Sequence, residues 1–160
     1  CAMHINGQYG LACETQVATL GNKVTIRPLA HMKVIRDMVV DLDPFFAQYE
    51  AIKPYLVPKV VPGPREFSQS PKDRKKLDIL VDCILCASCY GSCPVVGTDE
   101  KYLGPHALMK ALRFIDDTRD GETNKRLAFV ANDAGIFRCH TIFNCHLKPL
   151  MCEVKILRYN

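Results

Sequence analysis

The chain has 160 residues, of which 48% are hydrophobic and 24% charged, and its formal net charge is +4. This composition predicts a globular chain with enough apolar residues for a core, and no stretch reaches the ~18 consecutive apolar residues of a membrane-spanning helix. Nucleic acid is not an expected partner, because the basic run Lys72-Asp73-Arg74-Lys75-Lys76 contains an acid and has the spacing of a solvated helix face.

The first residues carry β-strand signals. Asn6-Gly7 is typical of a two-residue hairpin turn, and Val24 and Ile26 alternate with polar neighbours. We therefore predict a β segment over residues 1–27. The change to a helical pattern is placed within residues 35–42.

The next part of the chain predicts a helix followed by an extended connection. Asp43 is placed to act as the N-cap, Pro44 would occupy the first helical position, and Pro54 would stop the helix. Residues 57–64 contain three prolines and a glycine, which indicate an extended surface segment. The apolar face of this helix is expected to comprise Phe46, Tyr49 and Ile52.

Three further helices are predicted. Ser70-Pro71-Lys72-Asp73 resembles a capping arrangement at the start of a helix that leads into Cys83. Another helix starts at Gly104-Pro105, and a last one is expected over residues 123–134, ending at Gly135. The apolar faces of the first two are Leu77, Leu80 and Val81, and Leu108, Ala111, Leu112 and Ile115.

Charged and imidazole side chains away from the cysteines are interpreted as structural or solvent-facing rather than as ligands. No second histidine or carboxylate stands at a convincing metal-ligand spacing from His4, His31 or His106. Five charged residues lie around the end of the helix that starts at Gly104-Pro105, and we expect them to form ion pairs rather than to perform acid–base catalysis. They are Arg113, Asp116, Asp117, Arg119 and Asp120.

One cysteine motif carries the strongest chemical signal. Cys83, Cys86, Cys89 and Cys93 have the spacing C-x2-C-x2-C-x3-C, and Pro94 follows. A short loop with this spacing wraps an iron–sulfur cubane: three thiolates reach one [4Fe–4S] cluster, and the fourth points to a second cluster. A zinc knuckle is the alternative, but two C-x2-C pairs satisfy zinc, which needs neither the third nearby cysteine nor the Cys-Pro.

Five other cysteines bring the total to nine. An odd number arranged in groups favours metal ligation in a reducing compartment over a disulfide framework. These five are Cys1, Cys13, Cys139, Cys145 and Cys152.

Several segments together have the pattern of one known family. They are Cys1-Ala2-Met3 through Leu11-Ala12-Cys13, Val34 to Asp41, Ile52 to Leu56, Cys83 to Pro94, Leu103-Gly104-Pro105, Asp117 to Asp120, and Arg138 to Cys145. With these segments the chain resembles, over about residues 1–146, the iron–sulfur subunit of succinate dehydrogenase and fumarate reductase. Two-cluster subunits of the heterodisulfide-reductase or glycolate-oxidase type usually repeat the whole cysteine motif, whereas the second group here is C-x5-C.

The resemblance implies an α+β fold. Residues 1–38 would be the C-terminal remnant of a β-grasp [2Fe–2S] ferredoxin domain, and residues 39–160 an α-helical ferredoxin domain with a two-cluster motif. It also implies an electron-transfer subunit of an enzyme, a succinate:quinone oxidoreductase or fumarate reductase. An FAD-containing flavoprotein partner would perform the dicarboxylate chemistry, and electrons would pass to or from membrane quinone at an anchor subunit. The location implied is peripheral, on the cytoplasmic side of a bacterial inner membrane or the matrix side of the mitochondrial one.

The resemblance also implies a set of ligands. Cys83, Cys86 and Cys89 match [4Fe–4S] ligands, and Cys1 and Cys13 match part of a [2Fe–2S] site. A [3Fe–4S] cluster would be held by Cys93, Cys139 and Cys145. Positions that border the quinone pocket are matched by Pro94, His140 and Ile142, although His140 could equally be a histidine bonded to the backbone beside the cluster.

The chain departs from the family pattern in three places. It begins at the third [2Fe–2S] ligand, so we expect a fragment, or, more rarely, a split subunit completed by another polypeptide. Pro149 stands where the last [4Fe–4S] ligand is expected, and Cys152 or, less well, His146 could replace it; a shifted frame or truncation is the alternative. The segment Val95-Val96-Gly97-Thr98 lacks the tryptophan of many ubiquinone-reacting relatives. An assembly or interface module without a complete electron path is therefore the second functional hypothesis.

Overall fold

The chain opens with the expected β-hairpin. In the computed structural model, which describes residues 1–61 and 63–145, β1 (Ala2–Ile5) pairs antiparallel with β2 (Gln8–Leu11). Asn6 and Gly7 both have positive φ, 46° and 88°, as a type I′ turn requires. After the 3₁₀ turn η1 (Val17–Thr19), β3 (Ile26–Arg27) joins the other edge of β1. The β prediction is confirmed.

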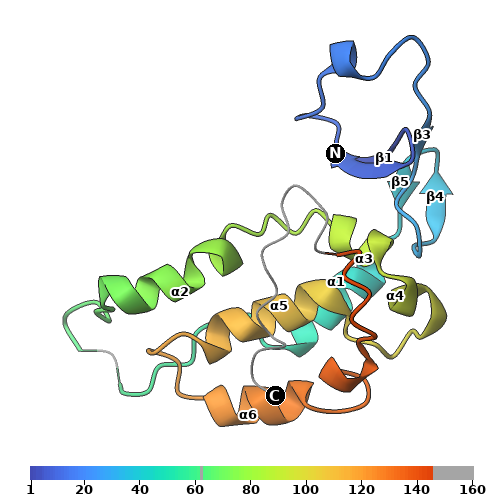
Figure 1. Cartoon of the computed structure of the whole chain (residues 1–160). Coiled ribbons are helices and arrows are strands. Elements are labelled where there is room, and N and C mark those ends of the chain that lie inside the picture. The colour runs from blue at the N-terminus through green and yellow to red at the C-terminus, as the bar shows by residue number, and fades with distance from the viewer. Residues whose placement is uncertain (62, 146–160) are drawn as a thin grey trace.

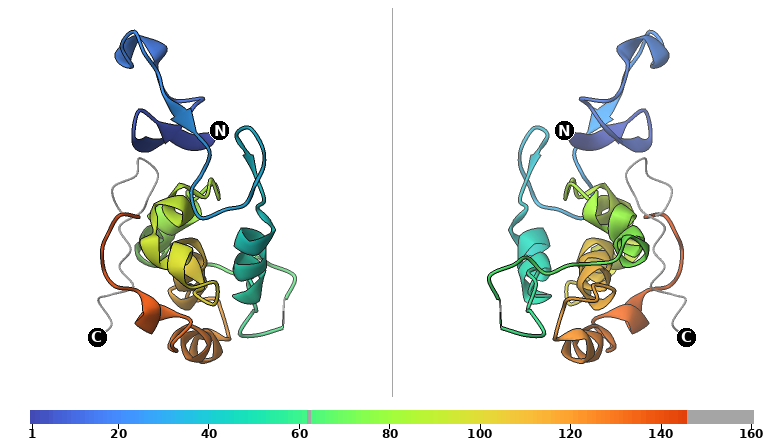
Figure 2. Two further views of the ribbon diagram at one scale, coloured as in Figure 1. Left: turned by 90° about the vertical axis from the view of Figure 1, so that its right-hand side faces the viewer. Right: turned by 90° about the vertical axis from the view of Figure 1, so that its left-hand side faces the viewer.

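A second, two-stranded ribbon was not predicted. β4 (Val34–Arg36) and β5 (Val39–Val40) pair antiparallel with an irregularity in register. Val34, Ile35 and Val39 are all exposed, so apolar and polar positions do not alternate between a buried and a solvated face. The usual sequence signal of a strand is therefore absent. Both views in Figure 2 place the strands on one side of the helices.

The first helix begins one residue earlier than expected and buries a different side chain. α1 (Asp43–Ala51) has Leu42 at its N-cap, and the Asp41 carboxylate accepts a hydrogen bond from the Asp43 amide at 3.0 Å. Phe45 is 1% exposed, whereas Phe46 is 39% exposed. Phe46 was thus wrongly assigned to the apolar face, because the helix turns Phe45 toward α5 (Gly104–Ile115), where its ring stacks on His106 at 3.9 Å.

The helices around the core pack against α5, which crosses the centre of the molecule (Figure 1). α2 (Pro71–Val81) starts as expected, because the Ser70 hydroxyl accepts a hydrogen bond from the Asp73 amide at 3.1 Å. Its buried Leu77 and Leu80 form one cluster with Met109 and Leu112 of α5. The predicted apolar faces of these two helices are confirmed.

Three short helices complete the fold. α3 (Ser88–Ser92) and α4 (Pro94–Thr98) lie on either side of Cys93. α6 (Thr123–Val130) ends four residues before the predicted end, because the Asn132 carboxamide accepts hydrogen bonds from the amides of Ala134 and Gly135 and turns the chain into η2 (Ile136–Arg138).

Two buried carboxylates organise the segment between α5 and α6. The Asp117 carboxylate forms ion pairs with the guanidinium groups of Arg113 at 2.9 Å and Arg119 at 2.8 Å, so the predicted ion pairing is confirmed. Asp120 instead pairs with Arg126, which also donates to the carbonyl oxygens of Ile52, Lys53 and Tyr55. Burial alone would raise the pKa of Asp120, but its hydrogen bonds with Arg126 and the backbone lower that pKa below its ordinary value.

Replacing Arg126 with Met should lower the stability of the folded chain strongly. The change leaves the Asp120 carboxylate buried without its cation, so we expect the free energy of unfolding to fall by about 3–5 kcal/mol. Urea titration followed by circular dichroism measures this. The matched control is Lys125→Met, which removes a solvent-exposed pair with Glu122 and should leave stability nearly unchanged. Equal effects of the two variants would contradict the role given to Arg126.

His106 is a buried structural residue, as expected. It is 1% exposed, and its Nε2 lies 2.8 Å from the Phe45 carbonyl oxygen. Burial lowers the pKa of His106 from 6.5 to about 4, with the Phe45 bond opposing the shift. The imidazole is therefore neutral in the folded chain near neutral pH.

The sign of the pH dependence follows from that lowered pKa. Between pH 6.5 and about 4 the unfolded chain binds the His106 proton and the folded chain does not. Stability from neutral His106 is complete above pH 6.5 and is lost as the pH falls toward 4, by about 3 kcal/mol. Urea titrations across this range should show a shallower slope for His106→Asn, while a His31→Asn control at an exposed position should keep the wild-type slope.

Candidate metal centres

The loop between α2 and α3 holds Cys83 and Cys86, and Cys89 follows in the first turn of α3. Leu85 and Ala87, which flank Cys86, have positive φ of 56° and 63°. Non-glycine residues seldom adopt this conformation, and such strain often marks a functional loop. Cys89 is 5% exposed; burial, and then the neighbouring charges of Cys83, Cys86 and Cys145, raise its pKa well above the ordinary value. Cys89 therefore lies within electrostatic reach of these three thiols.

A second group of cysteines surrounds a small cavity at the start of α4. Burial raises the pKa of Cys93, hydrogen bonds with the Val96 and Val95 backbone oppose the shift, and the charge of Cys139 adds to it. The cavity has a volume of about 60 Å³. It brings together six residues that the sequence analysis singled out, Cys93, Pro94, Cys139, His140, Ile142 and Cys145.

Cys145 lies within electrostatic reach of both groups. It raises the pKa of Cys89, and it also contributes to the raised pKa of Tyr102, which is dominated by burial and then by Cys139 and Cys93. Tyr102 is 2% exposed and lines the same cavity. Cys145 therefore connects the two thiol groups, and Tyr102 lies beside the second one.

The remaining cysteines lie apart from these groups or outside the described residues. Cys1 and Cys13 are exposed at the open end of the β1–β2 hairpin, where the Ala12 amide donates to the Cys1 carbonyl oxygen at 2.9 Å. Cys152 lies outside the described residues.

The donor chemistry of both groups fits iron–sulfur clusters. Among residues 1–61 and 63–145, no three His, Cys, Asp or Glu side chains converge as a site for a single metal ion. The side chains that do gather are thiols, the soft ligands that hold iron–sulfur clusters, and they are partly or fully buried. Backbone amides at the Cys93 sulfur are of the kind that tune such clusters.

Known proteins are similar to this chain in both sequence and fold. Residues 1–47 match a family model described as a 2Fe-2S iron-sulfur cluster binding domain, and residues 75–148 match a 4Fe-4S dicluster domain. The chain is 46% identical over 148 residues to "Succinate dehydrogenase [ubiquinone] iron-sulfur subunit 1, mitochondrial" of Oryza sativa subsp. japonica, covering 91% of this chain and 53% of that relative. The chain belongs to the succinate dehydrogenase iron–sulfur subunit family. It spans about half the length of the curated relative that it matches.

A solved structure supports the same fold. A chain of the "Mycobacterium smegmatis Sdh1 complex in the apo form" superimposes with a TM-score of 0.77 at 27% identity, covering 91% of this chain and 62% of that chain. The expected α+β order, a [2Fe–2S] ferredoxin segment followed by a helical two-cluster domain, is thereby confirmed.

Sequence reasoning overlooked two residues near the thiols. Tyr102 precedes Leu103-Gly104-Pro105, and a bulky residue before a helix start gives no chemical signal by itself. Lys110 lies between Met109 and Ala111 of α5, and its burial could have been suspected only from a charge within an otherwise apolar helix.

Thiol reactivity should separate the exposed from the buried cysteines. In the cluster-free chain we expect iodoacetamide to alkylate Cys13 about tenfold faster than Cys89, because Cys89 is buried and its thiol resists ionisation. Peptide mass spectrometry over a time course measures both rates. The difference between the two alkylation rates should vanish in guanidinium. Equal rates in the folded chain would show that Cys89 is accessible to the reagent and would contradict its burial.

Proposed function

We propose that this chain is the electron-transfer subunit of a succinate:quinone oxidoreductase or fumarate reductase. The observation that carries the proposal is the proximity of the two thiol groups across α3, which begins one residue before Cys89 and ends one residue before Cys93. Cys83, Cys86 and Cys89 would hold a [4Fe–4S] cluster. Cys93, Cys139 and Cys145 would hold a [3Fe–4S] cluster, which needs only three thiolates.

The residues of this chain would bury and tune the two clusters. When bound, the clusters accept and release single electrons. The apolar cavity around Cys93 limits access of water, and the amides at the start of α4 stabilise negative charge on its sulfur. The left-handed conformations of Leu85 and Ala87 would place Cys86 toward the other two ligands of the [4Fe–4S] cluster. The fourth ligand of the [4Fe–4S] cluster would be Cys152, outside the described residues.

Cys1 and Cys13 would contribute to a [2Fe–2S] site. A plant-type site takes four cysteines, so its other ligands would come from residues beyond this sequence or from a second polypeptide. We propose the division between the β-grasp part and the helical part at residue 38, so that the first covers 1–38 and the second 39–160.

The same cavity supports a quinone contact at the [3Fe–4S] end. Pro94, His140 and Ile142 line it together with Cys93 and Cys139. Ile142 and Phe143 are about half exposed, and Phe137 is 63% exposed, so apolar side chains reach the surface beside the cavity. We propose that this surface faces a membrane anchor subunit and quinone.

The membrane and the flavoprotein would be reached through partner subunits. None of the helices in the described part of the chain is long and apolar enough to cross a membrane. We propose a peripheral position, on the cytoplasmic side of a bacterial inner membrane or on the matrix side of the mitochondrial one, with the FAD-containing flavoprotein bound near the β segment. The mitochondrial name of the rice relative and the Sdh1 complex of M. smegmatis support such an assembly.

Single-cysteine variants test the assignment of the clusters. In chains reconstituted anaerobically with iron and sulfide, Cys93→Ser should lose the electron paramagnetic resonance signal of the oxidised [3Fe–4S] cluster and keep that of the reduced [4Fe–4S] cluster. Cys83→Ser should show the reverse, because a hydroxyl is a poor ligand for cluster iron. Cys13→Ser is the control and should keep both signals.

The outcome also separates the two functional hypotheses. A wild-type chain that binds the flavoprotein but never acquires a reducible cluster would contradict electron transfer and favour an assembly module. Loss of both signals in every variant, the control included, would show that the signals do not report the proposed ligand sets.

A further inference from the structure

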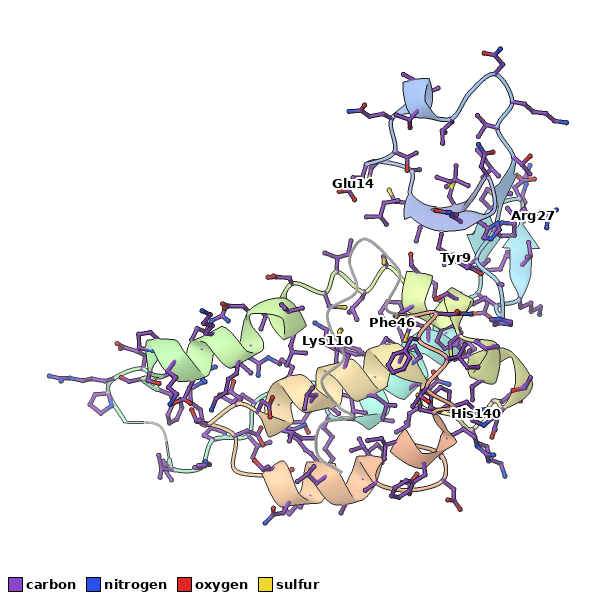
Figure 3. All side chains as sticks on the ribbon, viewed as in Figure 1. Tyr9, Glu14, Arg27, Phe46, Lys110 and His140 are labelled. Carbon is purple, nitrogen blue, oxygen red and sulfur yellow. The ribbon has the colours of Figure 1, made fainter. Side chains whose placement is uncertain are left out.

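Lys110 is a buried cation that contacts the backbone of a proposed cluster ligand. Its side chain leaves α5 beside the loop that leads from α2 to Cys83 (Figure 3). The residue is 9% exposed. Its Nζ donates to the carbonyl oxygens of Leu80 and Cys83, each at 3.3 Å. The ammonium group is therefore held against the first residue of the cysteine motif.

These two contacts lie at the end of α2. The last carbonyl groups of a helix have no partner within it and carry the negative end of the helix dipole. Lys110 satisfies one such group, the Leu80 carbonyl in the last turn of α2, and its charge stabilises the helix end; its second acceptor, the Cys83 carbonyl, lies just beyond the helix. Because Cys83 follows the helix by only two residues, Lys110 also restrains the position of the Cys83 backbone.

The charge of Lys110 has no counterion among the described residues. In residues 1–61 and 63–145, its Nζ forms no ion pair with a carboxylate, and its hydrogen bonds go to uncharged carbonyl groups. A buried ammonium group without an opposite charge is costly. An iron–sulfur cluster with its thiolates carries a net negative charge, and Cys83, whose carbonyl oxygen Lys110 contacts, is a proposed ligand of such a cluster.

We propose that Lys110 is a positioning residue that raises the reduction potential of the [4Fe–4S] cluster. The inference rests on the proposed function, because it requires a cluster at Cys83, Cys86 and Cys89. On reduction the cluster takes one electron from its donor, and no bond or proton changes at Lys110. The added negative charge is attracted by the fixed ammonium group, so the reduced state is favoured. Net charge and local contacts are among the quantities that set cluster potentials.

Redox titration of the anaerobically reconstituted full chain tests this inference. Lys110→Gln keeps a hydrogen-bond donor and removes the charge. At the same applied potential, the ratio of reduced to oxidised [4Fe–4S] cluster should fall about tenfold, which for a one-electron couple corresponds to about 59 mV. Lys75→Gln on the exposed face of α2 removes the same charge and should leave the ratio unchanged, because water and salt screen it.

Two further variants keep the test decisive if Lys110→Gln fails to assemble a cluster. Loss of the cluster in Lys110→Gln and Lys110→Met with retention in Lys110→Arg would support a requirement for positive charge. Loss in all three would overturn the inference, since packing alone would then explain the residue. A wild-type potential in Lys110→Gln overturns the inference and leaves the proposed function intact. A wild-type chain that forms no cluster overturns both.

Discussion

The buried pair of Asp120 and Arg126 is the interaction on which the helical part depends. The guanidinium group connects the segment after α1, through three carbonyl oxygens, with the segment that joins α5 to α6. Both segments would otherwise leave polar groups buried without partners. With these two segments joined, α5 packs between α1, α2 and α6. It also contacts α3, which lies between the two thiol groups. The positions of both thiol groups thus depend on an ion pair that includes none of the cysteines.

Around that framework, local backbone geometry arranges the thiols. Leu85 and Ala87, on either side of Cys86, have positive φ and turn the loop there. At the start of the same loop, the Lys110 ammonium group of α5 donates to the Cys83 carbonyl oxygen. The second group lies on the other side of α3, where α4 and the segment after η2 bring Cys93 and Cys139 together. Burial disfavours the ionised form of Cys89 in the first group and of Cys93 in the second, so cluster binding would have to offset the cost of removing these protons.

The features that sequence reasoning could predict are those encoded by local patterns. The Asn6-Gly7 turn, the Ser70 cap and the apolar face of α5 follow from short-range chemistry, and all three are confirmed. The choice of Phe45 over Phe46 depends on where α5 lies, and the early end of α6 depends on hydrogen bonds of one asparagine side chain. The cysteine motif predicted iron–sulfur binding because its spacing is itself the signal, and the match of residues 75–148 to a 4Fe-4S dicluster domain agrees with that prediction. The contact of Lys110 with Cys83 links α5 to a segment 27 residues earlier, and no pattern in the sequence connects them.

The shortness of α3 has a consequence for the rate of electron movement. Cys89 and Cys93 are separated by one turn of helix, a rise of about 6 Å. Cys93 leaves the helix with extended backbone angles, φ −88° and ψ 112°, so its sulfur is free to turn toward a different neighbour from that of Cys89. If the two thiol groups hold clusters as proposed, this single turn of helix joins a ligand of one cluster to a ligand of the other. Because tunnelling probability decays steeply with distance, so short a covalent connection would favour rapid electron transfer between them.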